Sequence, residues 1–194
     1  MGIIEDRRSI RKFKDKGIED KYVENIIHAA MMAPSPKNRQ PWKFIILKDY
    51  CQIQKLADKM ERTIKILSQE KPQRTDISMS LETIDVIKSA PVLVLVCYHH
   101  GLVPIHDDGV CWSINAKDVE AVELQALGAA VQNMLLKAQE LGIGSLWCAD
   151  VLYAYDVLKE YSDFPIVSAV CLGYANEEPI CRPRKSYEET CIYI

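Results

Sequence analysis

The sequence predicts a single domain of the α+β class, and three observations lead to this prediction. The chain has 194 residues, a length that suits one domain with a buried core. Hydrophobic residues make up 48% of the chain and charged residues 26%, as in ordinary globular proteins. Segments with helical spacing of apolar residues alternate with short apolar runs that are typical of buried strands. We see no internal repeat or low-complexity linker, so we expect one domain over residues 1–194.

Apolar spacing predicts the elements of the first half. A helix is expected over residues 18–32, and Pro34 ends it. A short buried strand is expected over residues 43–48. Asp49 can cap the helix that follows. The apolar face of that helix carries Ile53, Leu56, Ala57 and Met60.

The middle of the chain is less regular. Residues 72–80 are polar and are predicted to form a loop. A helical piece then leads to a strand over residues 92–98. Residues 99–113 contain two glycines and one proline and are expected to form an irregular loop.

The strongest helix is predicted over residues 118–141, with Gly142 as its C-cap. Its apolar residues lie on several sides, which is typical of a central core helix or of a helix at a subunit interface, and both interpretations can hold together. A strand is expected over residues 145–148, a helix from Asp150 to Tyr161, and a strand over residues 166–173.

Charge and cysteine usage exclude several classes of protein. The net charge is -3, and the arginine clusters have no interleaved aromatic residues, so we expect no nucleic-acid partner. The longest apolar run, residues 91–98, is too short to span a bilayer, and we see no signal peptide, so we expect no membrane association. The seven cysteines form no CxxC pair, and several lie in apolar runs. This pattern predicts reduced, buried thiols in a cytoplasmic protein, with a reactive cysteine as the less favoured alternative.

Two clusters of cations stand far apart in this slightly acidic chain. The cluster near the start comprises Arg7, Arg8 and Arg11, with the hydroxyl of Ser9 among them, and the cluster near the end comprises Arg182, Arg184 and Lys185. Guanidinium groups suit phosphate because their donors lie in one plane. We therefore interpret the clusters as two ends of one site for a phosphate-bearing cofactor. A solvated basic surface is the alternative for each cluster.

A loop over residues 33–42 is dense in turn residues and amide side chains. Asn38 and Gln40 can both donate and accept hydrogen bonds. Pro41 and Trp42 would fix the chain and offer an aromatic wall. The plainer alternative is a rigid connection between helix and strand with Trp42 in the core, and the two interpretations are compatible.

These segments together resemble the FMN-dependent nitroreductase family. They are residues 7–11, 33–42, 128–136, 140–147 and 182–189, in the order in which the family has them. The resemblance runs from about residue 3 to the end of the chain. It implies an α+β sandwich with a central mixed, mostly antiparallel sheet flanked by helices. It also implies an intertwined homodimer with two FMN molecules at the subunit interface, and a C-terminal tail, about residues 176–194, that wraps the partner.

The resemblance assigns cofactor contacts residue by residue. Contacts to the FMN phosphate and ribityl chain are expected from Arg7, Arg8, Ser9, Arg182 and Arg184. Arg11 corresponds to the cation near flavin N1 and O2, where it would stabilise the negative charge of the reduced flavin. Contacts from the other subunit are expected from Pro34, Ser35, Asn38 and Gln40. The strand end expected near flavin N5 and O4 comprises Trp147, Cys148, Ala149 and Asp150.

The implied activity is that of an NAD(P)H-dependent oxidoreductase. Hydride would pass from NAD(P)H to flavin N5 and then, in a ping-pong cycle, to a nitroaromatic or quinone-like small-molecule acceptor. The flavin carries the chemistry, so we expect no catalytic acid or nucleophile and no metal. The alternatives on the same fold are enone reduction, reductive dehalogenation and flavin-consuming chemistry. A non-enzymatic FMN-binding redox sensor is a further alternative.

Three segments differ from the family pattern or allow a second interpretation. Many family members have Gly or Glu-Gly where this chain has Ala149-Asp150, and a role of Asp150 as a helix N-cap is favoured over a carboxylate near the flavin edge. Residues 82–88 hold no convincing counterpart of the Asn and Lys that read the flavin pyrimidine in some members. The loop after residue 98 invites a metal interpretation, but a solvated loop or substrate lid is favoured because no second ligand pair has helical spacing. The residues concerned are His99, His100, His106, Asp107 and Asp108.

Overall fold

The computed structural model describes residues 2–99 and 116–194. The α-helices are α1 (Ile3–Asp6), α2 (Asp20–Met31), α3 (Tyr50–Glu70), α4 (Thr75–Ser89), α5 (Ala116–Glu140), α6 (Tyr155–Leu158) and α7 (Tyr187–Thr190). The strands are β1 (Trp42–Leu47), β2 (Val92–Tyr98), β3 (Gly144–Cys148) and β4 (Ile166–Gly173). Short 3₁₀ helices are η1 (Pro36–Asn38), η2 (Asp150–Ala154) and η3 (Lys159–Tyr161).

The four strands form one sheet in the order β1-β2-β4-β3, and each neighbouring pair is antiparallel. Parallel pairing occurs in a single isolated bridge between Ser9 and Ser145 within the described ranges. The expectation of a mostly antiparallel sheet is therefore confirmed, but its expected mixed character is not, because no two of the described strands pair in parallel. Because β1 and β3 are the two edge strands, the segments that precede β1 and follow β3 lie at opposite edges of the sheet.

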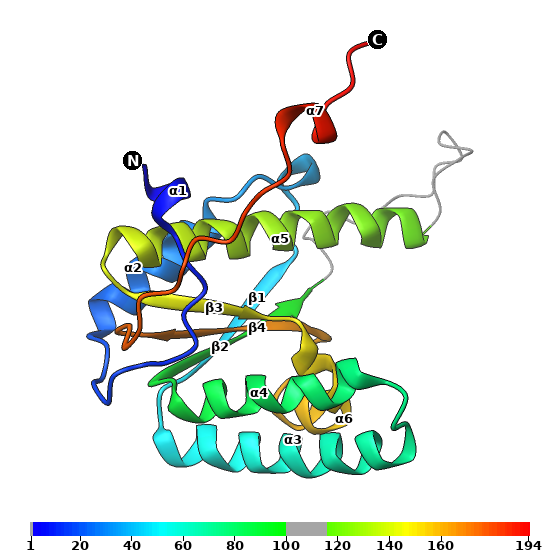
Figure 1. Cartoon of the computed structure of the whole chain (residues 1–194). Coiled ribbons are helices and arrows are strands. Elements are labelled where there is room, and N and C mark those ends of the chain that lie inside the picture. Colours follow the sequence, from blue (N-terminus) through cyan, green and yellow to red (C-terminus); the bar gives the residue numbers. More distant parts are fainter. Residues whose placement is uncertain (1, 100–115) are drawn as a thin grey trace.

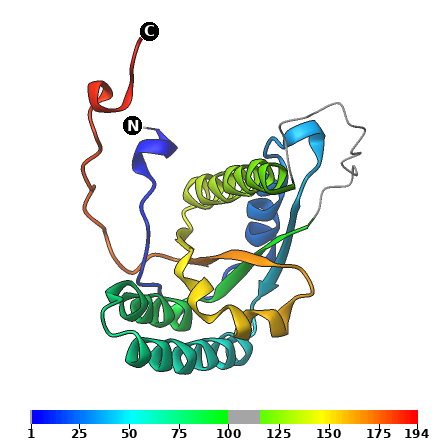
Figure 2. The ribbon, with the colours of Figure 1, turned by 90° about the vertical axis from the view of Figure 1, so that its right-hand side faces the viewer.

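Helices cover both faces of the sheet, as Figures 1 and 2 show. Helices α2 and α5 pack on one face, whereas α3, α4 and α6 pack on the other. Strand β2 is buried along its whole length because alternate side chains point to the two layers. Leu93, Leu95 and Cys97 join the α3–α4 core, and the valines between them join the α2–α5 core.

Most predicted elements are found close to their expected bounds, but the loop expected over residues 72–80 is wrong. Helix α4 already begins at Thr75. Ile77, Ser80, Ile84 and Ile87 are buried at helical spacing, and the polar residues between them face solvent. The stretch is polar because one face of a surface helix is polar, not because the backbone is irregular.

The segment 150–161 also differs from the single helix expected there. It consists of η2, α6 and η3 in succession. Ala154, between η2 and α6, has φ -113° and ψ 36°, which interrupts the helical geometry. The segment is helical as predicted, but it is not one continuous helix.

Helix α5 ends as predicted at Gly142, which has φ +70°. The amides of Gly142 and Ile143 donate to the carbonyls of Gln139 and Ala138, at 3.1 and 2.8 Å, and this pattern is a Schellman motif. The inner face of α5 is buried in the core, so the interpretation as a core helix is confirmed. On its outer face, Val122 and Leu124 are 43% and 38% exposed.

The C-terminal tail leaves the body of the chain. After Gly173 it runs past α5 and projects, with the N-terminus, to one side of the molecule (Figures 1 and 2). Its residues from 176 onward are exposed or half-buried. Helix α7 within it begins with a capping box, in which the Ser186 hydroxyl accepts from the Glu189 amide at 3.2 Å.

Six cysteines are described, and all are free thiols. Cys97, Cys148 and Cys171 are buried as predicted, whereas Cys51 and Cys181 are exposed. Burial raises the pKa of the Cys97 thiol. In the described part of the chain, we find no helix with the length and apolar character needed to cross a bilayer.

Candidate functional site

The N-terminal cations are held against the edge of the sheet by backbone pairing. The amide of Ile10 donates to the carbonyl of Ser145 in β3 at 2.9 Å. The side chain of Ile10 packs so closely on Gly144 that an added Cβ would lie 2.9 Å from Ile10 Cγ1. This pairing places Arg7 and Ser9, both half-buried, along β3.

A second set of hydrogen bonds joins this segment to the start of the C-terminal tail. The amides of Arg11 and Lys12 both donate to the carboxylate of Glu177, the second at 3.0 Å. The amide of Asn176 donates to the Lys12 carbonyl at 2.8 Å. The start of the chain and the start of the tail therefore lie side by side.

The arginines of the first cluster differ in their partners. Arg8 Nη1 donates to the carbonyls of Glu5 and Arg7, the latter at 2.9 Å, so this nitrogen binds backbone within its own segment. For Arg7 and Arg11, the structure shows no side-chain hydrogen bond or ion pair with any residue that it describes. Two guanidinium groups near β3 thus have their donors available for a ligand.

The second cluster is not brought to the first within one chain. Arg182 and Arg184 are exposed in the tail between Gly173 and α7. Their side chains make no contact with Arg7 or Arg11 in the parts of the chain that are described. Their predicted role in phosphate binding stays a prediction.

The end of β3 presents the predicted flavin-contacting segment. Trp147 is 44% exposed, and its ring would lie 3.8 Å from a Cβ added to Gly128 of α5. Cys148 is buried, Ala149 is exposed and Asp150 is half-buried. A hollow of about 410 Å³ follows, and its lining residues are Ala149, Asp150, Leu152 and Tyr153.

The N-cap role predicted for Asp150 is wrong. Ala149 is the N-cap of η2, and no side chain caps that helix. Asp150 occupies the first helical position instead, and its Oδ2 accepts a 2.6 Å hydrogen bond from Thr83 Oγ1 of α4. Thr83 was not singled out by sequence reasoning, since nothing in its neighbourhood indicates this contact across 67 residues.

The loop between α2 and β1 has an unusual backbone. Lys37, Asn38 and Gln40 have φ of 50°, 54° and 50°, which is a left-handed conformation that costs about 1–2 kcal/mol per residue. The Ser35 hydroxyl accepts from the Gln40 amide at 3.0 Å, and Gln40 Nε2 donates to Asn38 Oδ1 at 3.2 Å. Pro34 and Asn38 are exposed. Trp42 is buried in the α2–α5 core, as the plainer interpretation of this loop expected.

A buried ion pair lies directly beneath this loop. Arg39 Nε donates to Glu123 Oε1 of α5, and the Tyr98 hydroxyl at the end of β2 donates to Glu123 Oε2. Burial, together with the hydrogen bond to Glu123, raises the pKa of Tyr98, so this hydroxyl stays protonated and donates. Sequence reasoning missed this role, although Glu123 stands in the apolar stripe of α5 with Leu127 and Ala130, where a carboxylate needs a partner.

The candidate site therefore has two separate halves. Arg7 to Arg11 and the segment 147–150 lie at the β3 edge, and the loop 34–40 precedes β1 at the other edge. Three strand spacings separate these edges, about 14 Å in total. Within one chain, the two predicted halves do not form a single closed pocket.

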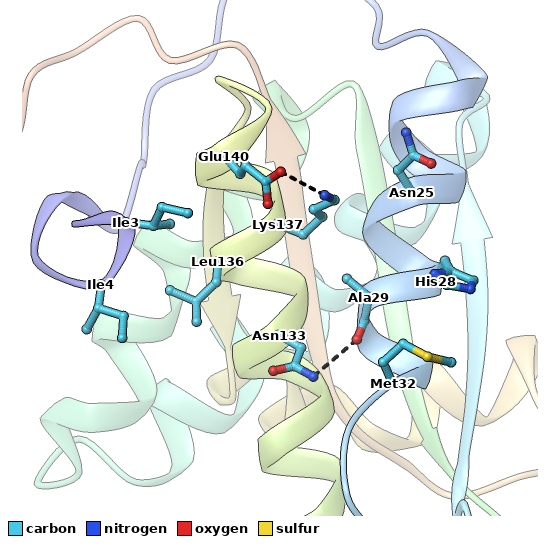
Figure 3. A pocket seen from close by; sticks show the side chains of 10 residues that line it. All are labelled: Ile3, Ile4, Asn25, His28, Ala29, Met32, Asn133, Leu136, Lys137 and Glu140. Carbon is cyan, nitrogen blue, oxygen red and sulfur yellow. Dashed lines mark hydrogen bonds and ion pairs between the residues drawn. The ribbon is translucent and has the colours of Figure 1, made fainter.

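A larger hollow lies elsewhere, between α1, α2 and α5 (Figure 3). Its volume is about 660 Å³. Its lining includes Ile3, Ile4, Met32 and Leu136, and none of the predicted cofactor-binding residues. Between two of its lining residues, Asn133 Nδ2 donates to the Ala29 carbonyl at 3.2 Å, which joins α5 to α2.

The comparison with known protein families settles the family. The model of the nitroreductase family matches residues 4–174. The chain belongs to this family. A relative in Archaeoglobus fulgidus, named as a candidate NADH dehydrogenase/NAD(P)H nitroreductase, is 29% identical over 186 residues, which cover 92% of this chain and 86% of that protein.

Solved structures of similar proteins agree with this nitroreductase fold. A BluB-like flavoprotein from Clostridium difficile 630 is 28% identical, with a TM-score of 0.83 over 99% of this chain and 97% of that one. A candidate nitroreductase from Desulfovibrio desulfuricans, solved in complex with FMN, is 26% identical, with a TM-score of 0.70 over 99% of this chain and 94% of that one. The predicted nitroreductase-like α+β fold is thereby confirmed.

Proposed function

We propose that this protein is an FMN-dependent NAD(P)H oxidoreductase of the nitroreductase type. Family membership over residues 4–174, the name of the Archaeoglobus relative and the FMN in the Desulfovibrio structure support this proposal. The acceptor we propose is a nitroaromatic or quinone-like small molecule, reduced in a ping-pong cycle. A cytoplasmic location is part of the same proposal.

The residues at the β3 edge fit a phosphate-bearing flavin. Arg7 is a half-buried guanidinium that has no partner among the described residues, and Ser9 adds a hydroxyl beside it. These groups are suited to a phosphate, which needs several donors and positive charge. Arg11 follows two residues after Ser9, which bridges Ser145 of β3, and the exposed ring of Trp147 belongs to the same strand. This availability of unpartnered cations beside β3 is the observation that carries the proposal.

The chain's own residues have binding and electrostatic roles in this account. When bound, FMN supplies the hydride chemistry at N5. Arg7, Arg8, Ser9, Arg182 and Arg184 would hold the phosphate and ribityl chain. Arg11 would stabilise the negative charge of the reduced cofactor. Trp147 to Asp150 would border the flavin through the backbone, and no side chain needs to move a proton.

We further propose a homodimer with FMN at the subunit interface. The loop 34–40 of one copy would complete the site at the β3 edge of the other, with contacts from Pro34, Ser35, Asn38 and Gln40. Two observations support it: the halves lie on opposite edges of the sheet, and the tail exposes large apolar residues. Ile180, Tyr187, Ile192 and Tyr193 are between 60% and 90% exposed. The hollow in Figure 3 has apolar lining residues, among them Ile3, Ile4 and Leu136, on which apolar residues of a partner's tail would pack.

An anaerobic reduction experiment tests the proposed activity. FMN-reconstituted protein is mixed with NADH, and separately with NADPH, and the flavin absorbance is followed. We expect bleaching with at least one donor, recovery on adding a nitroaromatic or a quinone, and parallel lines in steady-state kinetics. Bound flavin that stays oxidised with both donors would favour the sensor alternative. Bleaching without recovery by either acceptor would favour enone, dehalogenation or flavin-consuming chemistry.

A further inference from the structure

Glu123 is a carboxylate in the buried stripe of α5, and its side chain is 1% exposed. One of its oxygens accepts from Arg39 Nε and the other from the Tyr98 hydroxyl. Of the charged side chains that the structure describes, only Arg39 and Glu123 are buried. Because a buried charge that loses its partner is strongly destabilising, each of these two residues holds the other in place.

Arg39 is the buried charged side chain of a loop whose backbone is also held by hydrogen bonds from the Asn38 amide to the Ser35 carbonyl at 3.0 Å and from the His99 amide to the Pro41 carbonyl at 2.9 Å. The loop's left-handed residues lie on both sides of Arg39, at positions 37, 38 and 40. Non-glycine residues persist in this conformation only where the surroundings impose it. The hydrogen bonds of Ser35 and Asn38 with Gln40 are local and partly exposed, so they order the loop weakly.

We propose that Glu123 is a positioning residue for the cofactor site. By holding Arg39 inside the protein, Glu123 fixes the loop 34–41 in the conformation that presents Asn38 and Gln40 on its outer side. Tyr98 orients the carboxylate and links it to the end of β2. This inference rests on the proposed function, because the group that meets Asn38 and Gln40 is the flavin bound by a second copy. A displacement of Asn38 and Gln40 by about 1 Å would weaken their contacts with FMN. The buried ion pair therefore affects FMN affinity without touching the cofactor.

The test compares three variants of the full-length protein. E123Q keeps the shape of the side chain but removes the negative charge that faces Arg39, and R39M removes the cation. K88M is the matched control, because Lys88 pairs with Asp58 at 2.8 Å and Glu61 at 2.6 Å and joins α3 to α4 away from the loop. Hydrogen exchange of the Asn38 and Gln40 amides is measured on the apoprotein, and FMN affinity by titration of flavin fluorescence. Circular dichroism confirms that each variant is folded at the temperature used.

We expect E123Q and R39M to exchange these two amides faster and to bind FMN about tenfold more weakly or worse. K88M should lower the melting temperature and leave both measurements within about twofold of wild type. Folded E123Q with wild-type exchange and affinity would overturn the proposal. If E123Q does not fold, the same result in folded R39M would overturn it. Faster exchange in both variants would support the ion pair's role even if wild type bound no FMN. Failure of wild type to bind FMN would instead overturn the proposed function.

Discussion

Ile10 and Ser145 are joined by a 2.9 Å hydrogen bond from the Ile10 amide to the Ser145 carbonyl. Through this bond, a segment at the start of the chain becomes an addition to the edge of β3. The arginines that precede and follow Ile10 are thereby held beside the first residues of the strand that also carries Trp147. The position of the cationic segment is set by backbone pairing and by the fit of Ile10 against Gly144.

Gly144→Ala tests this attachment. The added Cβ would lie 2.9 Å from Ile10 Cγ1 and 3.1 Å from the Gly173 carbonyl oxygen, so Ile10 must shift. We expect a loss of about 1–3 kcal/mol in the free energy of unfolding, measured by denaturant titration, and weaker FMN binding. Gly17→Ala is the control, since its Cβ would meet nothing within 4 Å. Equal FMN affinity of both variants would show that the attachment does not position the cations.

Arg11→Gln tests the electrostatic role of Arg11. Loss of a positive charge beside the reduced cofactor should make its reduction potential more negative. The shift is about 30 mV for each 1.4 kcal/mol of stabilisation lost in a two-electron couple. Lys14→Gln, which removes another exposed cation of the same segment, should leave the potential close to that of wild type. Spectroelectrochemical titration measures both, and an unchanged potential in Arg11→Gln would contradict the assignment.

We expect different residues of the tail to serve dimer assembly and phosphate binding. A chain that ends at Glu178 keeps the Glu177 contacts to Arg11 and Lys12 but loses the exposed apolar residues. We expect this chain to be monomeric in light scattering and to bind FMN poorly. The full-length double variant R182A/R184A should stay dimeric and bind FMN about tenfold or more weakly. A truncated chain that is still dimeric would show that the tail is not needed for assembly.

Acid stability depends on Glu61 in α3. Hydrogen bonds from Lys65 and Lys88 lower the pKa of its carboxyl from 4.5 to about 2. The folded protein therefore binds this proton more weakly than the unfolded chain, so the stabilisation is present above pH 4.5 and is lost as the pH falls toward 2. At neutral pH, Glu61→Gln should cost about 0.5–1 kcal/mol of unfolding free energy, because the pair is partly exposed. Glu82→Gln, which lacks a described ion pair, should cost less, and an equal cost would contradict this role.

Much of the fold could be predicted because its elements have clear periodicity. The strand 166–173 and the helix before Gly142 follow from runs of apolar residues and a left-handed cap. The start of α4 was missed because its solvent face is polar, while the positions that face the core, such as Ile77, are too few in residues 72–80 to reveal the period. The packing against α3 makes this segment helical, and that packing is not a local property.

The candidate site could be predicted only in part, because some of its contacts join residues that are far apart in the sequence. The cations and amides could be proposed because their residue types and order resemble a family. The ion pair of Arg39 with Glu123 joins positions 84 residues apart, and the contact of Thr83 with Asp150 joins positions 67 apart. Sequence shows that a buried carboxylate such as Glu123 needs a partner, but the fold decides which cation it meets.

The central claim is that each FMN site is built by two chains, the β3 edge of one and the loop 34–40 of the other. It is tested most directly by a heterodimer of R7A/R11A with N38A/Q40A, purified with two different affinity tags. In such a heterodimer, one site combines both defects and the other combines neither. The account predicts that each homodimer binds FMN poorly, whereas the heterodimer binds one FMN with wild-type affinity. A heterodimer that binds no FMN tightly would contradict the account, because it would mean that both halves of each site come from the same chain.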